Sequence, residues 1–535
     1  MFPTQAFIDR LSGDLRRDLV AFLPELILCG AIVFMLLGRM IGAFSRLHMG
    51  VLAFAAGAVA LGVAIGMWPA ARTWATIGSV PQTGGSIAFS GLLVFDTFGL
   101  YVRVFLLVFL CFSVWLSMLT GIPDREDSAD YSTLLVGGTL GMMLMVSSNH
   151  LLMAFLAVEM ASLPSYVLAG FLKGRRQGSE AALKYVVYGA SASGVMLYGI
   201  SLIAGTYGTG LLPDMTKAIS DQGGMPIQVV IGVVCVIIGL GFKLSAVPFH
   251  FWCPDVFEGA AAEVGAFLSV ASKSAALALT ARFLFAVSGT LTNGQSDAAG
   301  SALAIMWALF AAITATFGNF AALAQSNLKR LLAYSTIAHA GIMMMALVPV
   351  GPRAVGPLLY YISAYLLMNL GAFAVVAIVR NQTGSEDISA YRGLIRRSPW
   401  LAIAMAFFLM SLLGLPPLAG FAAKFQVFAV IYDMGRSFGS ADAAFAWVYF
   451  GLLIIAALNT AVSAGYYLKI LRVMMLEEPS DESALRVSIG GRLLVLVLAV
   501  LVVLGGILWD PLTKLTDRGT RSFEPAPVST KENRS

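Results

Sequence analysis

The sequence predicts an all-α polytopic membrane protein with about fourteen transmembrane helices. Three observations support this prediction. Of the 535 residues, 59% are hydrophobic and only 12% are charged, whereas a soluble domain is about a quarter charged. Apolar runs of roughly 20 residues recur along almost the whole chain, which is the length of a helical span and not the alternating pattern of a membrane barrel. Basic residues gather in alternate connections between these runs.

The apolar runs define fourteen predicted spans in chain order. They are roughly 19–41, 49–68, 92–118, 132–147, 150–172, 182–207, 228–250, 262–288, 301–322, 330–350, 355–379, 399–432, 445–474 and 489–509. The mixed-charge segment before the first span is not a signal peptide, and we expect it to form a short interfacial helix.

Two of these spans are interrupted. The twelfth would stretch roughly 50 Å as one straight helix, which is too long for a single crossing, and Pro416, Pro417 and Gly420 predict a break inside it. The seventh ends in a proline-rich, aromatic and acidic segment that begins near Pro248. A break frees backbone polar groups, which side chains or water must then satisfy.

The distribution of basic residues predicts the orientation. Connections after odd-numbered spans carry Arg39, Arg46, Lys173, Arg175, Arg176, Lys329, Arg330, Arg392, Arg396, Arg397, Lys469 and Arg472. Connections after even-numbered spans carry only isolated bases. The positive-inside rule therefore places the first group in the cytoplasm and both termini on the outer side of the membrane. Because these bases lie in loops beside spans, the net charge of +5 does not indicate nucleic-acid binding.

The positions of the two breaks predict an internal repeat. Spans seven and twelve lie five spans apart and therefore cross the membrane in opposite directions, which is typical of inverted five-helix repeats in transporters. We expect spans 4–8 and 9–13 to form the inverted pair. The corresponding divisions are 1–130, 131–290 for the first repeat, 291–475 for the second, and 476–535 for the last span and tail.

Ionisable residues inside apolar runs are candidates for a proton path, because a charge at that depth is expensive and is functional by default. The candidates are Glu159, Lys184, Lys243, Lys273, His339 and Lys424. Lys184 lies near the end of its span. Extension of its ammonium towards water therefore explains the presence of a lysine there nearly as well as a role in the proton path does. A satisfied core histidine is as good an explanation of His339 as a proton relay.

The remaining polar residues near spans have less definite interpretations. His250, Asp255 and Glu258 lie at the seventh-span break, where they either line an entry from the cytoplasm or cap helix ends. Lys329 and Arg330 open the tenth span, and the simplest interpretation is that they are loop charges. Arg103 lies within the third span and receives no role.

The sequence contains no cofactor motif. It has no phosphate-binding loop, no dinucleotide fingerprint and no ligand spacing for haem, a cluster or a metal ion. The four cysteines are scattered and lie mostly in apolar runs, so we interpret them as small apolar side chains.

Several segments resemble the antiporter-like membrane subunits of respiratory complex I. They are the glutamate of the fifth span, EAALKYVVYG, GFKLSAVPFHFWCPDVFEGA, FLSVASK and GLPPLAGFAAKF, and the resemblance covers nearly all of the chain. Within that group the chain looks most like subunit N, the counterpart of mitochondrial subunit 2. One departure is AAAEVGAFLSV, where the family more often has a proline-threonine-proline motif, so that Glu263 is unexpected.

The resemblance implies a proton-translocating subunit of NADH:quinone oxidoreductase in the bacterial inner membrane. Glu159 would pair with Lys184 or Lys243, Lys243 would be the central switch, and Lys273, His339 and Lys424 would continue the axis. NADH, FMN, iron–sulfur clusters and quinone would bind to partner subunits. The partners would be antiporter-like subunits M and L, small subunits K and J, and lipid.

Two other classes of function remain as alternatives. One is a subunit of a multi-chain sodium/proton antiporter or of a related membrane-bound hydrogenase, although no mid-span site clusters the acids and carbonyls of a dedicated sodium cage. The other is a membrane enzyme acting on lipid or quinone, which would need a nucleophile, metal or redox site that the sequence does not display.

Overall fold

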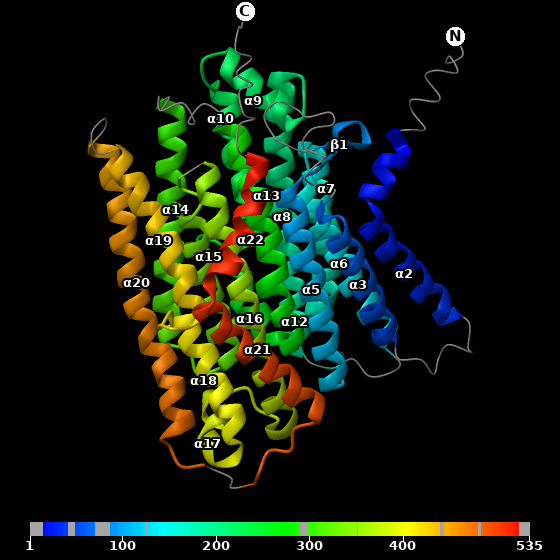
Figure 1. Ribbon diagram of the computed structural model, residues 1–535, viewed down its shortest axis with the longest axis vertical. Coiled ribbons are helices and arrows are strands. Elements are labelled where there is room, and N and C mark those ends of the chain that lie inside the picture. Colours follow the sequence, from blue (N-terminus) through cyan, green and yellow to red (C-terminus); the bar gives the residue numbers. More distant parts are fainter. Residues whose placement is uncertain are drawn as a thin grey trace, which may run out of the picture.

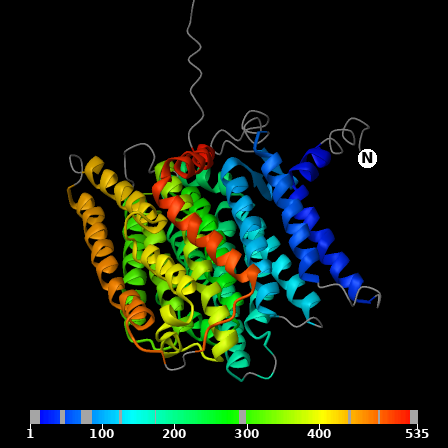
Figure 2. The same ribbon diagram turned by 60° about the horizontal axis from the view of Figure 1, so that its bottom comes forward.

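The computed structural model describes residues 14–40, 49–69, 86–122, 127–172, 174, 176–288, 298–349, 351–438, 443–479 and 483–523. Nearly all of these residues lie in long helices that run side by side (Figure 1). The helix α2 (Leu23–Met40) and the long helix α20 (Ala443–Met475) lie on opposite flanks of the bundle in both views (Figure 1, Figure 2).

The N-terminal region contains three long helices and a small hairpin. The elements are α2, α3 (Met49–Gly66), β1 (Ser86–Ala88), the short turn η2 (Phe89–Gly91), β2 (Leu93–Phe95) and α5 (Thr97–Thr120). The two strands pair antiparallel, with Ser86 opposite Phe95. Residues 14–21 form a helix that meets α2 at 71°, in agreement with the expected helix before the first span.

The next part of the chain contains the first interrupted span. Its elements are α6 (Ser128–Ser147), α7 (Leu151–Ala169), α8 (Arg176–Tyr207), α9 (Leu212–Asp221), α10 (Ile227–Leu244), α11 (Trp252–Gly259), α12 (Ala262–Phe267), the π-helical turn η3 (Leu268–Ser272) and α13 (Lys273–Val287). The helices α12 to α13 form one continuous span through the centre of the bundle, and every residue of its most apolar window is buried. Side chains on this span therefore contact protein and not lipid.

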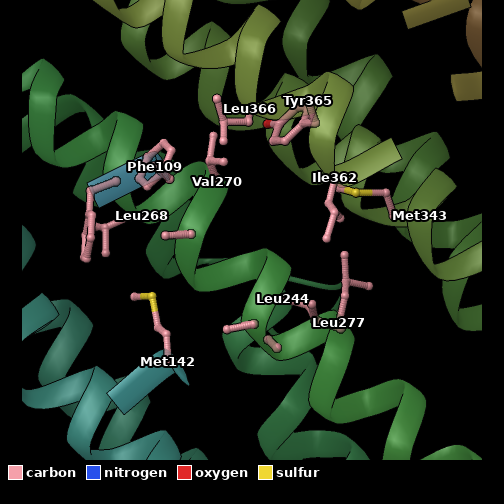
Figure 3. Packing of buried hydrophobic residues seen from close by; sticks show 14 of the residues in the cluster. Phe109, Met142, Leu244, Leu268, Val270, Leu277, Met343, Ile362, Tyr365 and Leu366 are labelled. Carbon is pink, nitrogen blue, oxygen red and sulfur yellow. The ribbon is translucent and has the colours of Figure 1, made fainter. Parts of the chain in front are cut away.

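The C-terminal part contains the second interrupted span. Its elements are α14 (Ala298–Leu323), α15 (Leu328–Met345), α16 (Pro352–Thr383), η5 (Ile388–Tyr391), α17 (Leu394–Arg397), α18 (Pro399–Leu413), α19 (Ala419–Phe438), α20, α21 (Ile489–Ile507), α22 (Trp509–Thr520) and η6 (Arg521–Phe523). In the centre of the molecule α16 packs against η3, and Figure 3 shows Val270 of η3 beside Leu366 of α16.

The predicted all-α polytopic membrane fold is confirmed. Among the described residues, eleven helices are long and apolar enough to cross a membrane, or twelve if the bent pair that includes α2 is one span. The tenth predicted span corresponds to α15, which carries charges in its first turn, and the twelfth corresponds to the shorter helices α18 and α19. The total of fourteen spans stays a prediction.

The first predicted break lies where α10 ends. Ser245 has a φ of 57°, in the left-handed region. The N–H of Ala246 donates to the Gly241 carbonyl at 2.8 Å, which is the six-residue hydrogen bond that terminates many helices. The chain continues through a cis Val247–Pro248 bond before α11 begins.

The second break has the same backbone pattern at the end of α18. Gly414 has a φ of 90°, and the N–H of Leu415 donates to the Met410 carbonyl at 3.1 Å. A cis Pro416–Pro417 bond follows, at the same distance from the left-handed residue as in the first break. The last residue of α10 is Leu244, directly before Ser245, and the last residue of α18 is Leu413, directly before Gly414. The carbonyls of Leu244 and Leu413 therefore occupy matching positions in the two breaks.

Candidate functional site

Lys243 lies in the last turn of α10, just before the first break, and is 1% exposed. Its Nζ donates to the Ser162 Oγ of α7 at 2.9 Å. The Ser162 hydroxyl in turn donates to the Val158 carbonyl of its own helix at 2.6 Å. The ammonium is therefore held by a neutral oxygen in a setting closed to water.

Glu159 lies one turn before Ser162 on the same face of α7. Its carboxylate accepts a hydrogen bond from Ser193 of α8 and lies within electrostatic reach of the Lys243 ammonium. Among the described residues no contact within 4 Å joins the Glu159 and Lys243 side chains. Glu159 and Lys243 thus influence each other through space, and each binds a serine hydroxyl.

Lys273 approaches the same break from the next span. It is the first residue after the π-helical turn η3, is 1% exposed, and its Nζ donates to the Leu244 carbonyl at 3.0 Å. π-Helical turns often occur at functional sites, because they redirect side chains within a helix. Lys243 and Lys273 therefore bring two buried ammonium groups to one helix end.

His250 lies in the same break, within electrostatic reach of Lys273. Its ring packs against Phe251 and Phe317, with ring centroids 4.5 and 4.4 Å apart. Its Nδ1 atom is buried and has no hydrogen-bond partner. The His250 ring is therefore buried beside two exposed phenylalanines, and its Nδ1 atom caps no helix.

Lys424 lies on α19, just after the second break, and is buried. Its Nζ donates to the carbonyls of Leu412 and Leu413, at 3.1 and 2.8 Å. The carbonyl of Leu413 is the counterpart of the Leu244 carbonyl that Lys273 binds. The lysines of the two breaks therefore satisfy backbone oxygens at the same position.

His339 of α15 lies between the two breaks in a group of tyrosines. Its Nδ1 is 2.8 Å from the Tyr361 hydroxyl, and its Nε2 is 3.2 Å from the Tyr467 hydroxyl. The ammonium of Lys424 is within electrostatic reach of the ring. Both ring nitrogens thus have partners that can accept or donate a proton.

Lys184 lies elsewhere, in a surface cluster. Its Nζ is 2.8 Å from both the Glu180 and the Asp255 carboxylates, and its side chain is 40% exposed. Arg330 binds the same Asp255 at 2.8 Å and Glu258 at 2.7 Å. A cavity of about 200 Å³ opens between these side chains. Of the two lysines expected to pair with Glu159, Lys243 lies within electrostatic reach of it, whereas Lys184 is bound by Glu180 and Asp255.

This surface cluster stabilises the charged form of Asp255. Burial alone would raise the pKa of the Asp255 carboxyl, but hydrogen bonds and charges from Lys184 and Arg330 outweigh it, so that the pKa is lowered. The group lies on α11, outside the candidate spans. Asp255 and Glu258 consequently form salt bridges with Lys184 and Arg330 in a partly exposed cluster.

The interpretation of Lys329 as a loop charge is wrong. Its side chain is fully buried, its Nζ lies 2.9 Å from the Glu386 carboxylate, and it donates to the Ala260 carbonyl at 2.6 Å. Asn327 accepts the Arg330 N–H and starts α15, which draws Lys329 into the first turn. That capping asparagine is the sequence signal that could have placed Lys329 inside the bundle.

Arg103 also acquires a partner. Its Nε lies 2.9 Å from Glu25 of α2, with both side chains fully buried, and its guanidinium stacks 4.3 Å from the centre of the Phe95 ring. The ring and the carboxylate belong to neighbouring elements of the N-terminal region. The pair therefore ties α2 to α5.

The described part of the chain holds no group of three histidine, cysteine, aspartate or glutamate residues that could bind a metal ion. Its four cysteines are free. The site described above brings together amine, carboxyl, imidazole and hydroxyl groups.

Comparison with known proteins gives a consistent result. The family described as NADH:quinone oxidoreductase/Mrp antiporter, TM matches residues 148–448. NADH-quinone oxidoreductase subunit N of Anaeromyxobacter sp. (strain Fw109-5) is 39% identical over 449 residues, covering 81% of this chain and 86% of that protein.

Two solved structures have the same fold. A chain of respiratory complex I from Thermus thermophilus with bound aureothin is 29% identical, with a TM-score of 0.71 over 92% of this chain and 99% of its own. A chain of the membrane-bound sulfane sulfur reductase, an archaeal respiratory membrane complex, is 20% identical, with a TM-score of 0.81 over 94% and 97%. The chain described here belongs to the NADH:quinone oxidoreductase/Mrp antiporter transmembrane family.

Proposed function

We propose that this chain is a proton-translocating membrane subunit of NADH:quinone oxidoreductase, driven by quinone reduction elsewhere in the complex. Its similarity to subunit N over most of both chains supports this function. The partners would be the other membrane subunits, including M, L, K and J. NADH, FMN, iron–sulfur clusters and quinone would be held by partner chains.

Protons would move along an axis formed by Glu159, Lys243, Lys273, His339 and Lys424. One observation carries this proposal. Each of the three lysines is buried and donates only to neutral oxygens, of Ser162 or of backbone carbonyls. A carboxylate in contact with an ammonium would fix its charge, whereas a neutral acceptor leaves the amine free to release its proton.

Lys329 provides the contrast within the same bundle. It is equally buried, but the Glu386 carboxylate contacts its ammonium directly. We assign Lys329 a fixed charge and exclude it from the axis. Lys184, which is bound by two carboxylates and partly exposed, would belong to the entry region and not to the buried path.

The arrangement of spans belongs to the same proposal. Fourteen spans with inverted repeats over 131–290 and 291–475 would place the two breaks at opposite depths of one axis. The matching hydrogen bonds at Ser245 and Gly414 support the repeat. The orientation with both termini in the periplasm of a bacterial inner membrane rests on the distribution of basic residues.

The test is proton uptake into inverted membrane vesicles that carry the assembled complex. Lys243→Ala should abolish most NADH-driven uptake, whereas Lys217→Ala, which removes an exposed lysine of α9, should leave it unchanged. Normal uptake with Lys243→Ala would contradict the proposed axis. Uptake that depends on sodium, without NADH or quinone, would favour the antiporter alternative.

A further inference from the structure

Glu263 is a buried acid that the proposed axis does not use. It lies in the first turn of α12 and is 2% exposed. The helix α12 lies in the half of the bundle that carries α17 (Figure 1). Neither carboxylate oxygen has a hydrogen-bond partner. The nearest cation is the Arg380 Nη2 of α16 at 3.8 Å, which is too far for a hydrogen bond.

Further polar atoms near Glu263 are also unpartnered. They include Nη1 of Arg380 and one oxygen of Glu386, both buried. Buried polar atoms in proteins are nearly always satisfied by protein or by bound water. Because protein supplies no partner for these donors and acceptors, water is the ligand that fits them.

The Glu263 region extends towards the protein surface through Lys329. The charge of Glu263 acts on Lys329, which is bound in turn to Glu386 at 2.9 Å. The Glu386 side chain is 13% exposed and so reaches solvent. Glu386, Lys329 and Glu263 therefore form a series of charged groups that begins at solvent and in which Glu263 and Lys329 interact through space.

The region extends inward along the same span towards Lys273. Ser269 accepts a hydrogen bond from Asn369 at 2.6 Å, and the remaining Asn369 oxygen and the Ser272 hydroxyl have no partner. Ser272 is the residue before Lys273. Glu263 and Lys273 are separated by about 15 Å of helix rise, and the Asn369 oxygen and the Ser272 hydroxyl are unpartnered polar atoms in this interval.

We propose that Glu263 is a proton-carrying residue that connects the α17 end of the bundle to Lys273 through bound water. A proton from water converts the Glu263 carboxylate to the carboxylic acid. The acid returns that proton to the water held by Asn369 and Ser272, and the last transfer converts the neutral amine of Lys273 to the ammonium. This inference rests on the proposed role of Lys273.

A purely structural role makes a different prediction. If Glu263 only neutralises Arg380, its loss leaves an uncompensated buried cation, and removing both charges should restore function. If Glu263 carries protons, removing both charges should not restore function. A double variant therefore separates the two roles.

The experiment uses the assembled complex in inverted membrane vesicles, with assembly checked on native gels. Glu263→Gln should lower the rate of NADH-driven proton uptake by up to about tenfold, the loss expected for Lys273→Ala. Glu263→Asp, which keeps a carboxylate, should retain more uptake than Glu263→Gln. Glu477→Gln, which removes an acid paired with Arg392 at the same end, should have no effect.

The variant Glu263→Gln/Arg380→Gln gives the decisive result. Continued loss of uptake supports proton transfer through Glu263, and recovery overturns it. The double variant leaves no uncompensated charge buried. If Glu263→Gln alone does not assemble, proton uptake by the double variant still distinguishes proton transfer from a structural role. Normal uptake in both Glu263→Gln and Lys273→Ala would contradict the axis itself, whereas normal uptake in Glu263→Gln alone would overturn only this inference.

Discussion

At the end of α10 the Leu244 carbonyl accepts a hydrogen bond from Lys273, a residue of the next span. At the end of α18 the matching Leu413 carbonyl accepts one from Lys424, a residue of the same span. The backbone patterns agree, but the sources of the lysines differ. In both breaks a lysine ammonium binds the last helical carbonyl. In the first break the lysine belongs to the following span, and in the second it belongs to the same interrupted span.

The first break has a second lysine that the second break lacks. Lys243 precedes Ser245 by two residues, whereas the corresponding residue before Gly414 is Leu412. The first break therefore has two buried amines with separate partners, Ser162 and the Leu244 carbonyl, whereas the amine of the second break lies within electrostatic reach of His339. We therefore expect the second break to be more sensitive to loss of its lysine than the first is to loss of Lys273.

The largest effect is expected at Lys424. Lys424→Ala should lower NADH-driven proton uptake on the order of a hundredfold, because it removes the only amine of this break. Lys424→Arg retains a cation for the carbonyls but does not release its proton near neutral pH, so it should also be impaired. Normal uptake with the arginine variant would make Lys424 a fixed charge and remove its role as a carrier.

A smaller loss is expected at Lys273. Lys273→Ala should lower uptake roughly tenfold, because Lys243 remains at the same break. The comparison with Lys424→Ala is made in vesicles of equal complex content. Equal losses in the two variants would mean that the second lysine gives the first break no advantage.

The smallest effects concern the left-handed residues and are measured as apparent melting temperature. Gly414→Ala should destabilise the protein by roughly 1–2 kcal/mol, because a left-handed residue with a side chain is strained. Its Cβ would also lie 2.9 Å from the Lys424 Cδ atom. Ser245→Gly should change stability by less than about 1 kcal/mol, since relieved strain offsets the greater freedom of the unfolded chain. A large loss with Ser245→Gly would show that the two breaks are not equivalent.

Sequence reasoning located the breaks but not all of their partners. Proline and glycine interrupt long apolar runs, so the break at Pro416 follows from local chemistry alone. The pairing of Lys329 with Glu386 depends on how the chain after α16 folds back over α15, which no local pattern encodes. The same is true of Arg103 with Glu25 and of Lys184 with Asp255.

Similar limits apply to the acids within the spans. Glu159 could be recognised because a single charge in an apolar span is conspicuous. Its closeness to Lys243 follows only from the tertiary structure, in which the Lys243 ammonium reaches Ser162 of α7. Glu263 was noticed as a departure from the family pattern, but its closeness to Arg380 required the structure.

The central claim is that Glu159 and Lys243 act together, and a double-mutant cycle tests it most directly. The measurement is protons taken up per NADH oxidised, in inverted vesicles carrying Glu159→Gln, Lys243→Ala or both. An unbalanced buried charge costs more than the removal of both charges. We therefore predict a strong loss in each single variant and no greater loss in the double variant. Losses that multiply in the double variant would contradict the account, because the two residues would then act independently.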